Sequence, residues 1–281
     1  MFDFFKKKDG KNKPQEPKLI MTTTEELLMP VRLYYTIHNK KSLIKALRKL
    51  KCVLFSEKDD NHFIISYHKE AKKFNLAVPY QEVPKELYPI TLAEGYIVGN
   101  SKLHIDTRSL RRGVELVDFL VKFIIPSSII EITAMANYNK ATVARDEDEY
   151  YQWFNVNYSE LFDNVRITDH NVELLNPIQK LIEFHEDSNE EREHKTLEEL
   201  DKKILLLKQQ EIDHYPDVEK IALHYNRASH EEMMNMLGFR AVIKEVVAKK
   251  RYDGDRHFTS FDAIDNFREF AEEKTLQSKF N

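Results

Sequence analysis

The first half of the chain contains short apolar segments bounded by polar turns, and these segments predict β-strands. Two pairs of segments flank a short polar turn, which is typical of a β-hairpin. The segments with this pattern are Val31–Ile37, Cys52–Phe55, His62–Tyr67, Tyr96–Val98, Leu103–Ile105 and Ile129–Met135. Because a hairpin joins neighbouring strands in opposite directions, we expect antiparallel pairing in this part of the chain.

Helical spacing interrupts these strands twice. Asn39 can cap a helix over Lys40–Leu50, where apolar residues recur every three or four positions. Ser109 can start a second helix that runs through Ile124 and is stopped by Pro126. Hairpins and helices in one segment predict an α+β fold rather than a doubly wound parallel sheet.

The second half of the chain has helical patterns almost throughout, so we expect it to form a bundle-like helical domain. Thr196 and Glu199 have the spacing of a capping box, and Thr259 and Asp262 have it again. Two heptads of leucine and isoleucine follow Thr196, which suits a seam between packed helices. The segments expected to be helical are Tyr150–Leu161, Ile178–Glu186, Leu197–Leu207, Asp217–Tyr225, Glu231–Lys250 and the residues after Thr259.

Charge divides the chain at the same place as the patterning. Residues 1–145 carry nine more basic than acidic residues, whereas residues 146–281 carry thirteen more acidic than basic ones. A change of sign this large favours a domain boundary. We therefore predict a basic tail without fixed structure over residues 1–18, an α+β domain over 19–145 and an all-helical domain over 146–281.

The 281 residues include only six glycines and one cysteine, which excludes several classes of site. No two glycines have the GxG spacing, and none precedes a Lys-Ser or Lys-Thr pair. Dinucleotide and nucleotide phosphate loops are therefore excluded, and the GxSxG nucleophile elbow is also absent. A single cysteine excludes a disulfide framework and a CxxC site. We expect no cofactor, no transmembrane segment and a cytoplasmic protein.

One strand and the start of the following helix carry candidate polar chemistry. His104 and Asp106 alternate along a strand and share a face, and Arg108 follows them. These three residues are the candidates for a hydrolase site. Arg108, Arg111 and Arg112 lie at a strand–helix junction, which favours anion binding. The simpler alternative is that Arg111 and Arg112 pair with nearby acidic residues on an exposed face.

Metal and aromatic patterns complete the candidates. Glu191 with His194 and Glu211 with His214 have the ExxH spacing of a metal site, and Glu190 could add a ligand. One continuous helix would hold the two pairs about 30 Å apart, so we expect no shared metal site.

Four aromatic residues directly follow an acidic run and could form a protein interaction hot spot. They are Tyr150, Tyr151, Trp153 and Phe154, for which burial in a core is the alternative. Because no enzymatic motif is present, we expect a non-enzymatic protein–protein interaction module with a protein partner or a second copy as its ligand. The alternatives are a nucleic-acid-associated protein that uses the basic first half, and a hydrolase centred on His104, Asp106 and Arg108.

Overall fold

A computed structural model describes residues 16–124, 129–167 and 190–268 of the chain, and for 190–200 it describes the backbone alone. It contains two β-sheets. Their strands are β1 (Lys18–Leu19), β2 (Val31–Ile37), β3 (Val53–Phe55), β4 (His62–Ser66), β5 (Thr91–Val98), β6 (Lys102–Thr107), β7 (Ile130–Tyr138), β8 (Val143–Ala144) and β9 (Val218–Ala222).

The larger sheet has seven strands in the order β3-β4-β5-β6-β2-β7-β9, and β1 pairs with β8 in the smaller one. All of the strand pairs are antiparallel. The predicted strand Val31–Ile37 is confirmed, and both predicted hairpins are confirmed as β3–β4 and β5–β6. Together with the helices of the second half, this sheet confirms the α+β fold class.

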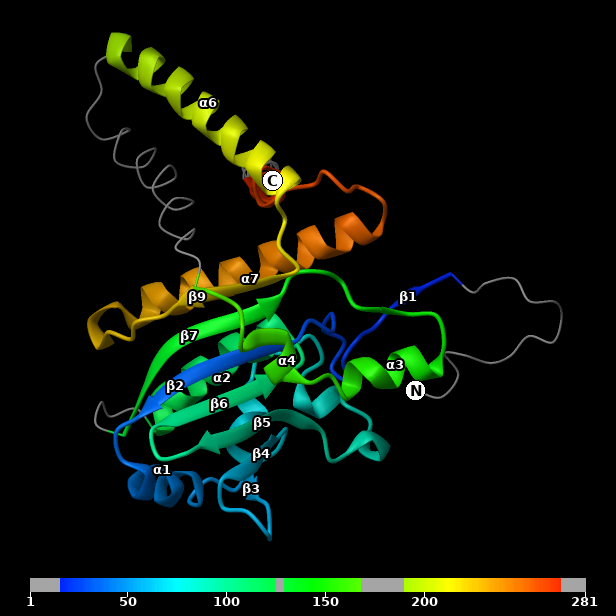
Figure 1. Cartoon of the computed structure of the whole chain (residues 1–281), viewed down its shortest axis with the longest axis vertical. Helices are drawn as coiled ribbons and strands as arrows, with labels where there is room; N and C mark the ends of the chain where they lie inside the picture. The colour runs from blue at the N-terminus through cyan, green and yellow to red at the C-terminus, as the bar shows by residue number, and fades with distance from the viewer. Residues whose placement is uncertain (1–15, 125–128, 168–189, 269–281) are drawn as a thin grey trace, which may run out of the picture.

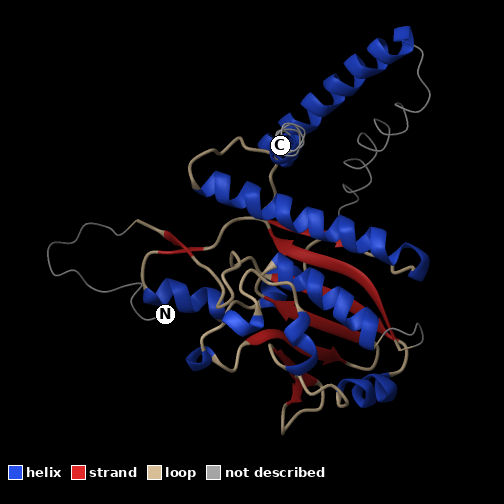
Figure 2. Cartoon of the chain, turned by 180° about the vertical axis from the view of Figure 1, so that it is seen from behind, coloured by secondary structure: helices blue, strands red, loops and turns tan. Residues whose placement is uncertain are grey.

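The α-helices of the described residues cover one face of the large sheet more fully than the other. The labelled helices are α1 (Lys40–Leu47), α2 (Leu110–Phe123), α3 (Glu147–Phe154), α4 (Tyr158–Phe162), α6 (Glu190–Asp213) and α7 (His230–Tyr252). Residues 260–268 are also helical, as predicted for the segment after Thr259. Short 3-10 helices are η1 (Lys69–Lys73), η2 (Tyr80–Glu82), η3 (Lys85–Leu87) and η4 (Arg227–Ser229). Figure 2 shows α2 and α7 in front of the sheet on one side, and Figure 1 shows α4 on the opposite side.

Three of the predicted helix caps are confirmed. The side chain of Asn39 accepts a hydrogen bond from the amide of Ser42, and the side chain of Ser109 accepts one from the amide of Arg112. A side-chain oxygen in these positions satisfies an amide that the first helical turn leaves without a partner. The capping box of Thr259 and Asp262 is also present, with a hydrogen bond in each direction.

The main hydrophobic core lies between the sheet and α2. Val31, Leu33 and Tyr35 of β2 alternate toward this core and are buried, as are Leu116 and Leu120 of α2. The packing is close enough to require a glycine in β5. A Cβ atom on Gly95 would lie 2.1 Å from the Cζ atom of Phe63, its partner on β4. A larger residue at position 95 therefore cannot fit without moving the aromatic ring.

Two charged networks are buried on the helix-covered side. The Nε of Arg112 donates to Glu26 at 3.1 Å, and these two side chains are 2% and 1% exposed. Arg112 also donates to Thr24, while Glu26 accepts from the hydroxyls of Thr22 and Thr24. Full hydrogen bonding is what makes a buried charge pair tolerable.

The second network joins β9 to α7. Glu219 of β9 accepts from Arg240 and Lys244 of α7, each at 2.9 Å. These two cations hold the pKa of Glu219 well below its usual range, although burial acts in the opposite direction. The network therefore attaches the edge strand and the long helix to the same sheet.

Three expectations for the second half are wrong. The segment Asp217–Tyr225 is not helical, because its residues Val218–Ala222 form strand β9 at the edge of the sheet. The half is therefore not all-helical. Helices α3 and α4 replace one predicted helix over Tyr150–Leu161, because Asn157 caps a new helix with its side chain. The described part of helix α6 already includes Glu190, so Thr196 lies inside the helix and does not cap it.

The remaining expectations about organisation are only partly addressed. Strand β9 pairs with β7 and α7 contacts α2, so contacts cross the boundary that is predicted near residue 146, and the division into two domains stays a prediction. Residues 1–15 of the predicted tail and the predicted helix Ile178–Glu186 lie outside the described residues, whereas Lys18 belongs to β1. Among the described helices, none is both long and apolar enough to cross a membrane.

Candidate functional site

Alternation along three neighbouring strands places polar side chains on the face of the sheet that α2 and α7 do not cover. The backbone register pairs Glu94 of β5 with Asp106 of β6, and Asp106 with Arg32 of β2. Two residues further along, Tyr96 pairs with His104, and His104 pairs with Tyr34. Because side chains two positions apart in a strand share a face, these residues form two polar rows across the sheet.

The first row is centred on a buried ion pair. The Nε and Nη2 of Arg32 donate to the two oxygens of Asp106 at 2.6 and 2.8 Å. Arg32 is 4% exposed and Asp106 is 6% exposed. Burial raises the pKa of Asp106, although the guanidinium of Arg32 opposes this. Both oxygens of this carboxylate are therefore already in use.

Arg32 also attaches helix α4 to the sheet. Its Nη1 donates to the hydroxyl of Ser159 at 3.1 Å and to Asp163 at 2.9 Å. On the neighbouring row, the Tyr34 hydroxyl donates to the carbonyl of Phe162 at 3.4 Å. The Phe162 side chain is fully buried. Helix α4 therefore covers this face of the sheet over β2, which β6 separates from β5.

The second row is aromatic. His62 of β4 stacks on Tyr96 with ring centroids 4.8 Å apart, and His104 contacts Tyr34 edge to face at 5.0 Å. Burial, together with the positive charge of Arg32, lowers the pKa of His104 to about 4. At neutral pH this imidazole is therefore uncharged, and it acts as an aromatic ring.

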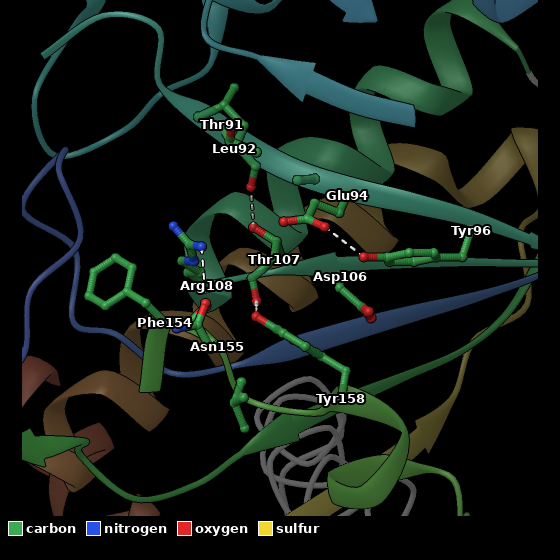
Figure 3. Close-up of a pocket in the computed structure, with 12 residues that line it drawn as sticks. Thr91, Leu92, Glu94, Tyr96, Asp106, Thr107, Arg108, Phe154, Asn155 and Tyr158 are labelled. Carbon is green, nitrogen blue, oxygen red and sulfur yellow. Dashed lines mark hydrogen bonds between the residues drawn. The ribbon is translucent and has the colours of Figure 1, made fainter. Parts of the chain in front are cut away.

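A pocket of about 230 Å³ opens on this face, between β5, β6 and the chain that joins α3 to α4 (Figure 3). It is lined by Thr91, Leu92, Ala93, Glu94, Tyr96, Asp106, Thr107, Arg108, Phe154, Asn155, Val156 and Tyr158. The hydroxyl of Tyr158 donates to the carbonyl of Thr107 at 2.9 Å. This bond fixes the aromatic ring that forms one wall.

Opposite charges occupy opposite ends of the pocket. Figure 3 shows Glu94 with Tyr96 on one side and Arg108 with Phe154 on the other. The guanidinium of Arg108 lies 4.6 Å from the centre of the Phe154 ring and donates to the Phe154 carbonyl at 3.3 Å. The cation at this end is therefore held in place by α3.

Glu94 is the carboxylate with unused hydrogen-bonding capacity. Its Oε2 accepts from the Tyr96 hydroxyl at 2.6 Å, and the Nε2 of His62 lies 3.6 Å from the same oxygen. Its Oε1 accepts no hydrogen bond from any described residue. Burial and the Glu94 carboxylate raise the pKa of Tyr96, so this tyrosine remains a donor at neutral pH. Glu94 can accept one or two further hydrogen bonds from a ligand.

The structure brings together only part of the predicted hydrolase centre. Asp106 and Arg108 line the pocket, whereas His104 lies in the second row and does not line it. Asp106 shares its face with His104, as predicted, but its carboxylate is engaged by Arg32 rather than by the imidazole.

The three predicted anion-binding arginines do not converge on one site. Arg108 lies against Phe154, while Arg112 is buried with Glu26. Arg111 acts electrostatically on Glu245 of α7. A strand–helix junction brings three arginines close in sequence, but successive helical residues point in different directions. The alternative, in which Arg111 and Arg112 pair with nearby acidic residues on an exposed face, is right that Arg112 pairs with an acidic residue but wrong about the exposed face, because both Arg112 and Glu26 are buried.

The four aromatic candidates divide between core and surface. Tyr150, Trp153 and Phe154 pack against a small buried cluster of Ile20, Leu28 and Ala144. Tyr151 is 48% exposed, and Phe154 also lines the pocket. The core alternative therefore accounts for most of this group, while Phe154 contributes to the candidate site.

The metal candidates are only partly described. Glu191, His194 and Glu211 lie in one continuous helix, α6, as expected, and His214 follows directly after it. The side chains of Glu190, Glu191 and His194 lie outside the described residues. Among the side chains that are described, no group of three potential metal ligands lies close together.

Sequence reasoning missed Arg32, Glu94, Tyr96 and Tyr158. The signal for the first three was the alternation of polar residues within the strands, as in Arg32 and Tyr34 of β2. Their convergence depends on strand order, which one sequence does not reveal. Searches against protein-family models, curated proteins and solved structures found no match to the chain.

Proposed function

We propose that the chain is a non-enzymatic protein–protein interaction module, and that its sheet-face pocket receives a basic side chain of the partner. The observation that carries the proposal is the half-buried carboxylate of Glu94, which has one oxygen free of hydrogen bonds within the described part of the chain. A guanidinium or ammonium group supplies both the charge and the donors that this oxygen lacks.

The size of the pocket supports a side chain rather than a complete small molecule. Its volume of about 230 Å³ is below the roughly 300–1,000 Å³ of ordinary small-molecule sites. Binding energy at protein interfaces is concentrated where one anchoring side chain enters such a depression.

The aromatic walls favour arginine over lysine. Tyr96 and Tyr158 line the pocket beside Glu94, and a planar guanidinium can stack on an aromatic ring while it bonds to a carboxylate. At the other end, Arg108 can donate hydrogen bonds to a carboxylate or a backbone carbonyl of the partner. The two ends together would fix the direction of the bound segment.

Binding is favoured over catalysis because the strongest predicted base is engaged. Both oxygens of Asp106 accept hydrogen bonds from Arg32, and His104 lies outside the pocket lining. A catalytic base must be free to reach the proton that it removes. The carboxylates of Glu94 and Asp106 would also repel phosphate groups, which weighs against a nucleic-acid function for this face.

The proposal is tested by following backbone amide NMR shifts while a short peptide is added. The probe is acetyl-Gly-Arg-Gly-amide, and its citrulline counterpart has nearly the same shape without the charge. We expect the arginine peptide to shift the amides of Glu94, Tyr96 and Asp106, with a Kd of about 1 mM. The citrulline peptide should shift them at least about tenfold more weakly.

Two carboxylate variants provide the control. Glu94→Gln should weaken the response about tenfold or more, whereas Glu131→Gln should leave it unchanged, because Glu131 is an exposed carboxylate elsewhere on the same sheet. The proposal fails if both peptides act equally, if the shifts lie away from the pocket, or if no shift occurs up to about 10 mM peptide.

A further inference from the structure

A second pocket lies beside the C-terminal end of α7, which is drawn in orange in Figure 1. It has a volume of about 480 Å³ and is lined by Asn139, Lys140, Ala141, Val143, Tyr215, Ala248, Arg251, Tyr252 and Arg256. This volume falls within the range of ordinary small-molecule sites. The lining contains three cationic residues and no carboxylate.

Arg251 is the best-positioned of the three cations. Its Nε donates to the carbonyl of Phe258 at 2.8 Å, and its guanidinium lies 3.7 Å from the centre of the Tyr215 ring. These two contacts hold the guanidinium in one orientation. Tyr215 is itself fixed, because its hydroxyl donates to the carbonyl of Asn139 at 3.2 Å.

The other donors of Arg251 have no acceptor among the residues that the structure describes. Its Nη2 is buried and makes no hydrogen bond with any described residue. Neither terminal nitrogen donates to a group in the described part of the chain. Leaving a guanidinium donor without an acceptor is costly, and an anionic ligand would supply acceptors.

The surroundings of Arg251 are also favourable for an anion. Lys140 pairs with Asp217 at 2.5 Å, but both side chains are more than half exposed, so this pair is weak. Arg256 is exposed, and no carboxylate pairs with it among the described residues. The end of α7 does not oppose an anion strongly, since the amides of Asp253, Gly254 and Asp255 bond to its last carbonyls.

From these contacts we infer that this pocket binds a small organic anion, a phosphate or carboxylate attached to a flat aromatic body. The charged group would bond to Arg251 and Arg256. The aromatic body would lie against Tyr252 and the apolar side chains of Ala141 and Val143. This inference uses none of the residues of the sheet face and does not rest on the function proposed for it.

The test is isothermal titration calorimetry on the full chain in about 50 mM NaCl, where charge interactions are weakly screened. The probes are AMP, phenyl phosphate and benzoate, with adenosine and benzyl alcohol as uncharged counterparts. We expect at least one anion to bind, and its uncharged counterpart to bind about tenfold more weakly or worse. The anion that binds best identifies the charged group as phosphate or carboxylate.

Variants locate the binding. Arg251→Gln should weaken the anion about tenfold or more, and Arg256→Gln tests the same charge without disturbing a buried group. Arg48→Gln is the matched control, because Arg48 forms an exposed ion pair with Asp60 outside this pocket. Unchanged melting temperatures show that each variant is folded.

Three results would overturn the inference. They are the absence of binding by all three anions up to about 10 mM, equal binding of the uncharged counterparts, and unchanged affinity in both pocket variants.

Discussion

The charged side chains on the two faces of the seven-stranded sheet differ in how completely they are hydrogen-bonded. On the helix-covered side, Arg112 and Glu26 are buried together and bond to each other and to nearby threonine hydroxyls. On the opposite face, Arg32 satisfies Asp106, but Glu94 beside it keeps one oxygen free of hydrogen bonds from the described residues. The first arrangement has no hydrogen-bonding group left for a ligand, whereas the second can bind one more cation.

This difference separates stability from binding. Removing one member of a fully bonded buried pair destabilises the fold, because the other charge is left uncompensated, and such a pair has no donor or acceptor left for a ligand. A half-buried carboxylate with an unused oxygen contributes little to folding and can recognise a charged partner. Substitutions on the two faces should therefore change different measured quantities.

The largest effect on stability is expected from breaking the buried Arg112–Glu26 pair. Arg112→Met leaves Glu26 buried without its cation, which should lower the free energy of unfolding by about 3–5 kcal/mol. Urea denaturation followed by circular dichroism measures this loss. Adding Glu26→Leu should recover a large part of it, because no uncompensated charge remains. If Arg112→Met alone lowers the free energy of unfolding by less than about 1 kcal/mol, Glu26 does not depend on Arg112 for its burial.

A smaller effect on the same side comes from close packing. Gly95→Ala forces a methyl group into the ring of Phe63 and should cost about 1–3 kcal/mol. Gly238→Ala is the matched control, because a Cβ atom at this position in α7 meets nothing within 4 Å. It should instead raise stability by up to about 1 kcal/mol. Thermal unfolding of the two variants should therefore shift in opposite directions.

Glu245 of α7 is a carboxylate on the helix-covered side of the sheet that lacks a full set of hydrogen bonds among the described residues. Its Oε1 is buried without a hydrogen bond among the described residues, and burial raises its pKa to about 7, which Arg111 opposes. Between the ordinary pKa of a glutamate and pH 7, the Glu245 carboxyl group keeps its proton in the folded chain but has lost it in the unfolded chain. At low pH the Glu245 side chain is protonated in both the folded and the unfolded chain and does not change the free energy of unfolding. As the pH rises, ionisation of this buried side chain lowers the free energy of unfolding.

Glu245→Gln should accordingly leave stability unchanged near pH 4 and raise it by about 1 kcal/mol near pH 8, after allowance for partial exposure. Denaturation midpoints measured across this pH range decide the point. The same gain at both pH values would show that the carboxylate charge is not the cause.

Local signals predicted much of the fold. The caps Asn39 and Ser109 were readable because an N-cap depends on a few adjacent residues. Strand β9 was not readable, because five residues at a sheet edge are defined by pairing with β7 rather than by their own pattern. Thr196 was misleading because capping-box spacing also occurs inside a longer helix.

The candidate site was predictable only residue by residue. Asp106 and Arg108 stood out because they lie beside each other at the end of a strand. Glu94 and Arg32 were not identified, because their proximity to Asp106 depends on the register of three strands. Burial of one face of the sheet fixes this register, so the sequence of a single strand does not predict it.

The most direct test of the two-face account compares Glu94→Gln with the unsubstituted chain in two measurements. We predict that the free energy of unfolding changes by less than about 0.5 kcal/mol, because Glu94 is only half-buried. We predict that binding of acetyl-Gly-Arg-Gly-amide, measured by calorimetry, weakens about tenfold or more. A variant that binds the arginine peptide as well as the unsubstituted chain does would contradict the account.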